Sequence, residues 1–467
     1  MLMRTLLIRP GGPEFSQVTS RLEPLGLERV AAALRAMGHD VRILDLRISA
    51  QRDLQRELRQ FRPEAAGFGI DCLAGVPGAL DLAKRIKRES PGCFAFAGGH
   101  GVAPIAGHVL GQAGGVLDAV VRGEGEVAAP LLLAAARDGG LGDVPGAVTA
   151  EGSCHRMPLP LDVIDEPRPA RDLTRGREKY VIGVLTPAAA IEFGRGGRTV
   201  SPRAAAAELS SIREWYVFIV DDTVFTLPGH GDAVAAEIER RRVRKRYCVR
   251  TRAEVLLAHP QLFRRWQKLG LKHLVLSVGS LDRQAAERDT EALELARDMR
   301  ITVTVDLGVD PGWDTGRFRL IRAWARSVPE TVGLTVTTPY PGAPGWPVQS
   351  RRLTTRDYRL FDAAHAVVPT TLPLDRFYRE LALTRAMVNR KHPGVAPTDR
   401  RHGVVARGLW CGWSGVVNGF RGARSVYGAE RGYRDHLRAC PYTLPVPAEP
   451  HLGTADRPGV HFHRRPH

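Results

Sequence analysis

Glycines and carboxylates in the first third of the chain recur at three points that could hold a ligand. These are Glu23-Pro24-Leu25-Gly26, Gly98-Gly99-His100 and Gly123-Glu124-Gly125-Glu126. Glycine lets the backbone approach a bound group closely, because it has no Cβ atom. The first segment opens a predicted helix, and each of the other two follows a short apolar run typical of a buried strand. The spacing therefore predicts three loops that bind one ligand together.

A parallel sheet is needed to bring these three segments to one place. Residues 1–148 alternate strand and helix signals, which predicts a doubly wound α/β sheet with helices on both faces. Such a sheet binds ligands at the carboxyl ends of its strands, where all three segments are expected. The expected strands are residues 5–8, 41–46, 65–70, 94–97 and 119–122, and the expected helices are residues 24–37, 53–61, 77–88, 104–111 and 126–136.

The rest of the chain divides into four further regions. Residues 149–178 are rich in proline and read as a linker. Residues 179–345 hold a second strand–helix series, which predicts a partial (β/α)6 barrel with its site at the carboxyl ends of the strands. Residues 346–449 are expected to be mostly helical, with helices or connecting segments at 358–366, 374–389 and 424–438, and residues 450–467 are expected to be a flexible tail. The expected barrel strands are residues 191–193, 216–220, 246–250, 273–278, 302–307 and 333–338.

Charged residues lie at the ends of several predicted barrel strands. Asp222 and Asp310 each follow a strand, and Arg250 ends another. A carboxylate in such a place can bind ligand hydroxyls or a cationic ligand, and it can equally cap the helix that follows. Trp313, Tyr340 and Trp346 lie nearby and either wall an apolar pocket or belong to the core.

Composition limits the class of protein. The chain has 467 residues, of which 43% are hydrophobic and 25% charged, as in globular proteins of two to three domains. No run of 18 apolar residues predicts a transmembrane helix, and the start lacks the pattern of a signal peptide. The net charge of +17 reflects either an arginine-rich surface or an acidic partner such as a membrane. No specific nucleic-acid partner is expected, because the chain has no dense basic arm or RNA-binding motif.

The cysteines are scattered along the chain. None forms a CxxC or CxxxCxxC motif, and a chain of this length does not need a disulfide framework, so a cytoplasmic location is expected. The six are Cys72, Cys93, Cys154, Cys248, Cys411 and Cys440.

The three N-terminal segments, with Gly38-His39-Asp40-Val41 between them, resemble the cobalamin-binding domain of B12-dependent radical S-adenosylmethionine enzymes. His39 and His100 are not expected to bind cobalt, because the lower-ligand motif Asp-x-His-x-x-Gly is absent. The resemblance implies that cobalamin contacts Glu23, Pro24, Leu25, Gly26, Gly98, Gly99, His100, Gly123, Glu124, Gly125 and Glu126.

The second half of the chain extends the resemblance. Asp221-Asp222 is similar to the family's F-x-D-D strand end, and residues 353–358 and 374–392 are similar to the hopanoid C-3 methylase branch. This implies methyl transfer to a hydrophobic, triterpenoid-like acceptor, with S-adenosylmethionine bound near Asp222, Arg250 and Asp310. The resemblance runs to about residue 445.

One family motif is missing. The family carries CxxxCxxC after the first barrel strand, where three thiolates hold a [4Fe–4S] cluster and leave one iron open. Here Arg195-Gly196 runs directly into Gly197-Arg198. A second departure is Ser277-Val278-Gly279-Ser280-Leu281-Asp282, where the family has an acidic residue, before a shortened helix at 284–297. We therefore expect no metal site and no radical step, and the sequence identifies no catalytic residue.

Three hypotheses follow. The first is a methyltransferase of this family that acts on a small hydrophobic substrate, with peripheral membrane contact through its basic surface. The second is a cobalamin-binding carrier, sensor or partner subunit, or a protein that transfers methyl groups from cobalamin without a cluster. The third, a nucleic-acid-binding protein, rests on the net charge alone. The sequence leaves the oligomeric state open.

Overall fold

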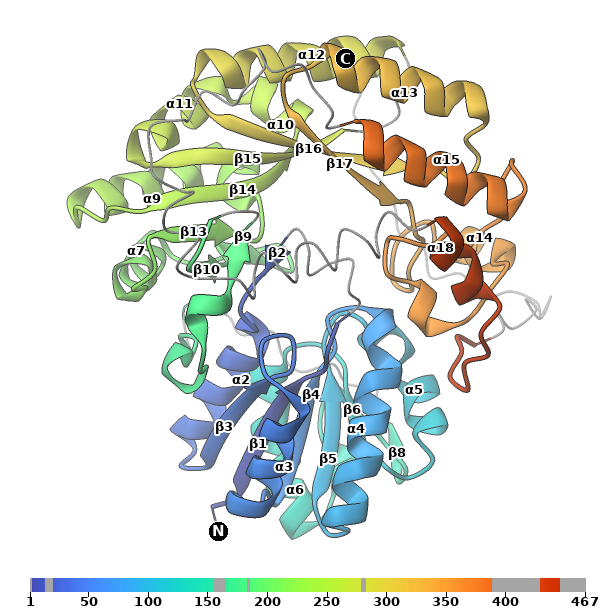
Figure 1. The fold of residues 1–467 in the computed structure, drawn as a ribbon. Coiled ribbons are helices and arrows are strands. Elements are labelled where there is room, and N and C mark those ends of the chain that lie inside the picture. The colour runs from blue at the N-terminus through green and yellow to red at the C-terminus, as the bar shows by residue number, and fades with distance from the viewer. Residues whose placement is uncertain are drawn as a thin grey trace, which may run out of the picture.

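Two parallel sheets dominate the structure, a computed structural model that describes residues 2–12, 20–153, 165, 167–182, 185–278, 283–388 and 429–445. Figure 1 shows the N-terminal sheet below and the second sheet arched above it, with its concave side toward the N-terminal sheet. The expectations for Cys154, Cys411, residues 279–282, residues 389–392 and the tail at 450–467 fall outside the described residues.

The N-terminal sheet has seven strands in the order β3-β1-β4-β5-β6-β7-β8. Its first five strands pair in parallel, as predicted, whereas β7 and β8 add an antiparallel edge that the sequence did not reveal. The strands are β1 Arg4–Arg9, β3 Asp40–Asp45, β4 Ala65–Gly69, β5 Phe94–Gly98, β6 Ala119–Val121, β7 Ala147–Thr149 and β8 Gly152–Ser153. The helices are α2 Leu25–Ala36, α3 Gln51–Gln60, α4 Val76–Glu89, α5 Ala106–Ala113 and α6 Gly125–Asp138.

Both faces of this sheet are buried. In β1, Leu6 and Ile8 belong to one apolar cluster and Leu7 to another on the opposite face. All three side chains are fully buried. Successive residues of a strand point to opposite faces, so a run of apolar residues needs helices on both sides. The predicted doubly wound fold is confirmed.

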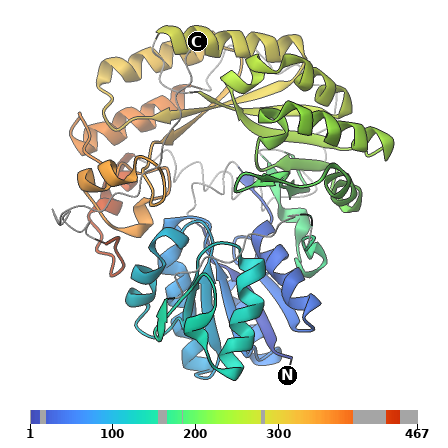
Figure 2. The ribbon, with the colours of Figure 1, turned by 180° about the vertical axis from the view of Figure 1, so that it is seen from behind.

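The second sheet has six parallel strands in the order β10-β13-β14-β15-β16-β17. Helices cover its outer face (Figures 1 and 2), as expected for a partial barrel. The strands are β10 Ala188–Ile191, β13 Tyr216–Ile219, β14 Arg246–Arg252, β15 Leu271–Val278, β16 Thr302–Val309 and β17 Thr331–Val336. The covering helices are α7 Pro202–Ser211, α8 Thr223–Thr226, α9 Pro228–Arg240, α10 Ala253–Ala258, α11 Pro260–Leu269, α12 Arg283–Asp298 and α13 Thr315–Ser327.

The first barrel strand was predicted at residues 191–193, but β10 spans Ala188–Ile191. Three of its four residues are alanine, which has low strand propensity, so the sequence pattern began only at Ile191. All four residues of β10 are buried. The small alanine side chains allow neighbouring groups to pack closely on both faces of this strand.

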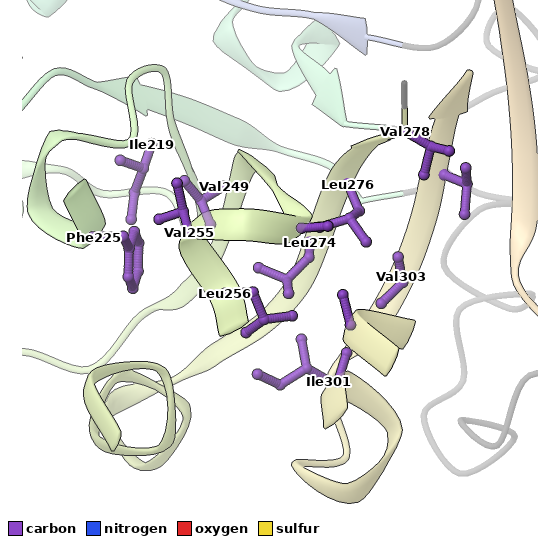
Figure 3. Close-up of a cluster of buried hydrophobic side chains, with 14 of the residues drawn as sticks. Ile219, Phe225, Val249, Val255, Leu256, Leu274, Leu276, Val278, Ile301 and Val303 are labelled. Atoms are coloured by element: carbon purple, nitrogen blue, oxygen red, sulfur yellow. The ribbon is translucent and has the colours of Figure 1, made fainter. Parts of the chain in front are cut away.

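The barrel core lies between the sheet and its helices. Figure 3 shows part of it, with Leu274, Leu276 and Val303 pointing from the strands toward the helices. At its centre is Trp266, which is fully buried. The Trp266 ring contacts Phe193 and Tyr247 edge-on, with centroids 5.9 and 5.5 Å apart.

The C-terminal region packs on both sheets. Its helices are α14 Trp346–Gln349, α15 Leu374–Met387 and α18 Ala429–His436, whereas residues 358–366 form a connecting segment with one short 3-10 turn. Phe377 of α15 joins the barrel core, and Tyr358 joins the core of the N-terminal sheet. The His108 Nε2 and Gln112 Nε2 atoms each lie 2.8 Å from the Thr443 carbonyl oxygen. This region therefore connects the two sheets.

Within the described parts of the chain, no helix combines the length and the apolar character that crossing a membrane requires.

Replacement of the central tryptophan tests the barrel core. We expect Trp266→Ala to lower the free energy of unfolding by about 3–5 kcal/mol, because it leaves a large cavity. Trp215→Ala is the matched control, since the Trp215 side chain is 48% exposed. Urea unfolding measures both, and equal losses in the two variants would contradict this description of the core.

Candidate functional site

The three N-terminal segments lie at one edge of the first sheet. Gly98 ends β5 and Gly99-His100 follows it, Gly123–Glu126 comes after β6, and Glu23–Gly26 leads into α2. The pairing of Ala97 with Val120 places the ends of β5 and β6 side by side. This carboxyl edge faces the second sheet (Figure 1). The structure thus brings together the segments that the sequence grouped, and their contact with cobalamin stays a prediction.

Bare backbone is accessible at this edge. Gly26, Gly99, His100 and Gly123 are all exposed. A Cβ atom added at Gly26 would have no neighbour within 4 Å, so a ligand can approach that position closely. This open backbone fits the flat face of a large cofactor such as a corrin, and the described residues are therefore compatible with cobalamin.

Gly99 has a different role. Its φ of +114° is one that other residues rarely adopt, and an added Cβ would lie 2.6 Å from the Ile70 carbonyl oxygen. The chain's own packing thus requires this glycine whether or not a ligand binds, so replacing it would not report on cofactor binding alone.

The carboxylates of these segments contact arginines of the second half. Glu126 forms an ion pair with Arg195, and Glu124 forms one with Arg198. The Glu23 side chain is fully buried and accepts a hydrogen bond of 2.7 Å from the Ala190 backbone N–H of β10. The sequence had assigned these side chains to cobalamin, and their described partners all belong to the protein.

The two arginines flank a tight hairpin. Strand β11 (Gly194–Arg195) pairs with β12 (Arg198–Thr199), and only Gly196 and Gly197 join them. Their φ angles are +58° and +79°, as in the type I′ turn that two-residue hairpins favour. The hairpin follows β10, the position at which the resemblance to radical S-adenosylmethionine enzymes implies a cysteine loop.

The described residues do not fit an iron–sulfur cluster. Cys72, Cys93, Cys248 and Cys440 are free and lie in separate segments, and burial raises the pKa of the Cys248 thiol. Among the residues that the structure describes, no group of three or more His, Cys, Asp or Glu side chains could hold a metal ion. An iron–sulfur cluster needs three thiolates that lie close together, and the described residues do not provide them.

A buried network of four glutamates and two arginines joins the two halves. Arg171 lies 3.1 Å from Glu23 and 2.7 Å from Glu208 of α7. Arg177 lies 2.6 Å from Glu23, and its other acidic partners are Glu28 at 3.2 Å and Glu214 at 2.6 Å. We call these six residues the inter-sheet network, and its carboxylates outnumber its guanidinium groups.

The imbalance raises the pKa of one carboxyl. Burial, and then repulsion from Glu23, raise the pKa of Glu28 from 4.5 to about 8. The Thr174 hydroxyl donates a hydrogen bond of 2.6 Å to Glu28 Oε1. Glu28 therefore tends to hold a proton at neutral pH.

The three residues expected on the S-adenosylmethionine side each have a different partner in the described structure. Asp222 accepts a hydrogen bond of 3.2 Å from the Thr251 hydroxyl, and Asp310 accepts one of 2.6 Å from the Gly312 N–H within its own loop. Arg250 forms an ion pair with Asp306, a residue that the sequence analysis missed. Ligand contact by these residues stays a prediction.

The remaining candidates lie elsewhere. His39 precedes β3, at the amino end of the first sheet, and burial lowers its pKa. Trp313 is buried edge-on against Phe318, with ring centroids 5.5 Å apart, and thus belongs to the core. Tyr340 is 60% exposed.

Comparisons with known proteins agree with this geometry. A family model described as "B12 binding domain" matches residues 15–133, which include all three segments. Hopanoid C-3 methylase of Methylococcus capsulatus is 39% identical over 491 residues, which cover 99% of this chain and 95% of the relative. Since that alignment is longer than the chain of 467 residues, the relative carries residues with no counterpart here.

Two solved structures share the fold. The radical S-adenosylmethionine methyltransferase TsrM of Kitasatospora setae has a TM-score of 0.61 at 15% identity, over 93% of this chain and 99% of that one. The cobalamin-dependent S-adenosylmethionine radical enzyme OxsB has a TM-score of 0.56 at 14% identity, over 71% of this chain and 53% of that one.

The proton on Glu28 gives a pH test of the inter-sheet network. The folded chain holds this proton up to about pH 8, whereas the unfolded chain releases it near pH 4.5. The resulting stabilisation is complete below pH 4.5 and is lost as the pH rises through 8. Glu28→Gln imitates the protonated carboxyl, so we expect its melting temperature to fall less between pH 6 and pH 9 than that of the unaltered chain. Parallel falls in the two proteins would contradict this assignment.

Proposed function

Because this chain belongs to the cobalamin-binding radical S-adenosylmethionine methyltransferase family, we propose that it binds cobalamin and acts on a triterpenoid-like acceptor without the family's radical step. Hopanoid C-3 methylase is a full-length relative. The observation that carries this proposal is the two-residue turn between Arg195 and Arg198, which stands where the cysteine loop belongs.

The carboxyl edge of the first sheet is the proposed cobalamin site. When bound, cobalamin would carry a methyl group between a donor and an acceptor. The chain would hold it through the exposed backbone at Gly26, Gly99 and Gly123. The second sheet faces this edge and would limit the access of water to the exchange of the methyl group (Figure 1).

Two features of the described chain argue against an iron–sulfur cluster. The turn of the hairpin consists of Gly196 and Gly197 alone and contains no cysteine. The described cysteines lie in separate segments. Reductive cleavage of S-adenosylmethionine needs an electron from the cluster. S-adenosylmethionine bound near the barrel mouth would therefore not be cleaved to a 5′-deoxyadenosyl radical.

A second candidate is a carrier or partner subunit that holds cobalamin without catalysis. It is favoured by the separate partners of Asp222 and Asp310, because the described residues of the barrel mouth show no assembled acid–base group. Methyl transfer from methylcobalamin to a triterpenoid in the absence of iron would favour the first candidate, whereas tight corrin binding without turnover would favour the second. Peripheral contact with anionic membranes, suggested by the net charge of +17, is part of both proposals.

Two matched glycine variants test the cobalamin site. Gly26 of α2 and Gly111 of α5 both lie in helices, and an added Cβ at either would meet nothing within 4 Å. We expect Gly26→Phe to abolish corrin retention, because its ring would occupy the ligand's place, and Gly111→Phe to keep it. The corrin bands of the visible spectrum after gel filtration give the readout. Equal corrin retention in both variants would contradict the assignment of the cobalamin site to this edge.

Reconstitution tests the absence of the cluster. We expect anaerobic incubation with iron and sulfide, followed by desalting, to leave no stoichiometric iron, since three thiolates do not meet at the hairpin. S-adenosylmethionine should yield no 5′-deoxyadenosine under a strong reductant. Recovery of about four irons per chain, with that product, would restore the radical mechanism.

A further inference from the structure

The inner face of the second sheet differs between its two halves. The inner face of the first three strands is covered by the protein itself. Ile182 packs there against Ala188 of β10, Phe218 of β13 and Cys248 of β14. Ile182 belongs to β9 (Val181–Ile182), which pairs with β2 (Ser20–Arg21) beneath these strands (Figure 1). This half of the barrel interior is therefore closed by the protein itself.

The other half is lined by small, half-exposed residues. Along β15, β16 and β17, buried residues that face the helices alternate with partly exposed ones on the inner face. The inner residues of this half are Ser277, Thr304, Asp306, Gly308, Gly333 and Thr335. Barrels of this size are normally filled by their own side chains. Partial exposure of these residues indicates that the described part of the chain leaves this half of the inner face uncovered, and we call it the open half.

One ion pair lies in the open half. Arg250 of β14 pairs with Asp306 of β16, and the Thr335 hydroxyl of β17 lies 3.3 Å from Asp306 Oδ1. The Arg250 side chain is 55% exposed and that of Asp306 16%. The strand neighbours of Asp306 are Ser277 and Gly333, so no bulky group covers it within the sheet.

The pair lies inside the barrel, away from its rim. Asp306 is three residues before Val309, the last residue of β16. Each residue of a strand advances by about 3.3 Å, so Asp306 lies about 10 Å from the carboxyl end. A ligand that reaches it must extend along the strands, as a long and flat molecule does.

The charges of the pair select a neutral polar group. Asp306 repels anions and Arg250 repels cations, whereas a hydroxyl can donate to the carboxylate and accept from the guanidinium. Deeper in the interior, His273 Nε2 lies 3.1 Å from the Thr304 hydroxyl, and burial lowers the pKa of His273 to about 4. This histidine therefore adds no charge at neutral pH.

We propose that the open half binds the acceptor and that Arg250 and Asp306 determine its specificity by binding one hydroxyl of an otherwise apolar molecule. The inference rests on the proposed function, which supplies an apolar acceptor. The ribose of S-adenosylmethionine offers the same hydroxyl chemistry, and the depth of Asp306 favours the acceptor.

The test compares two probes that differ in one group: a pentacyclic triterpene alcohol and the same hydrocarbon without its hydroxyl. We expect the cobalamin-loaded full chain to bind the alcohol about tenfold more tightly, because the hydroxyl bonds to two charged groups. Arg250→Met and Asp306→Leu should each remove this preference. Arg265→Met is the matched control, since Arg265 forms its ion pairs with α9 on the outer surface and should keep the preference.

Asp306→Asn provides a second test if Asp306→Leu fails to fold, because asparagine keeps the size of the side chain. This variant should lower the preference for the alcohol over the hydrocarbon. Equal binding of both probes by the unaltered chain, or an unchanged preference in the Arg250 and Asp306 variants, would overturn the proposal. Weakened S-adenosylmethionine binding in these variants, with the alcohol preference retained, would also overturn it in favour of the ribose. The corrin spectrum of each sample is recorded, so a failure to bind cobalamin counts separately against the proposed function.

Discussion

Buried contacts between arginines and glutamates hold the two sheets opposite each other, and the candidate site depends on them. Arg171 and Arg177 reach Glu23 and Glu28 of the N-terminal half and also Glu208 and Glu214 of the barrel. Separating the halves would leave buried charges without partners, which is costly. The carboxyl edge of the first sheet is thereby fixed beneath the inner face of the second. The bare backbone that could bind cobalamin and the open half that could bind an acceptor consequently face each other.

The hairpin of β11 and β12 extends this contact to the segment after β10. Its arginines pair with Glu124 and Glu126 in the segment after β6, so the hairpin is anchored on the proposed cobalamin edge. A type I′ turn joins two strands without strain, because glycine tolerates positive φ. Glycine at both turn positions therefore allows the hairpin to join β11 and β12 through two residues. The ion pairs that position the barrel on this edge do not involve a thiolate.

Sequence patterns predicted the elements that are locally encoded. The alternation of apolar strands and helices identified the first sheet and most of the second. The flanks Arg195-Gly196 and Gly197-Arg198 predicted that a cysteine loop is absent between them, and this stays a prediction. Alanine-rich β10 shifted the first barrel strand, and the three-residue β7 was too short to show a pattern. The partners of Glu23 could not be predicted, because Arg171 lies 148 residues further along the chain. Asp306 was missed for the same reason, since only the register of β14, β15 and β16 brings it to Arg250.

Hydrogen–deuterium exchange of the segment after β6 tests the central claim most directly. If the hairpin anchors the barrel on the proposed cobalamin edge, replacing both Arg195 and Arg198 by glutamine should speed exchange in residues 121–128, because the ion pairs of Arg195 with Glu126 and of Arg198 with Glu124 are removed. Exchange in α4, which lies away from the hairpin, should stay the same. Unchanged protection of residues 121–128 in this variant would contradict the account, because the ion pairs would then not hold the two halves together.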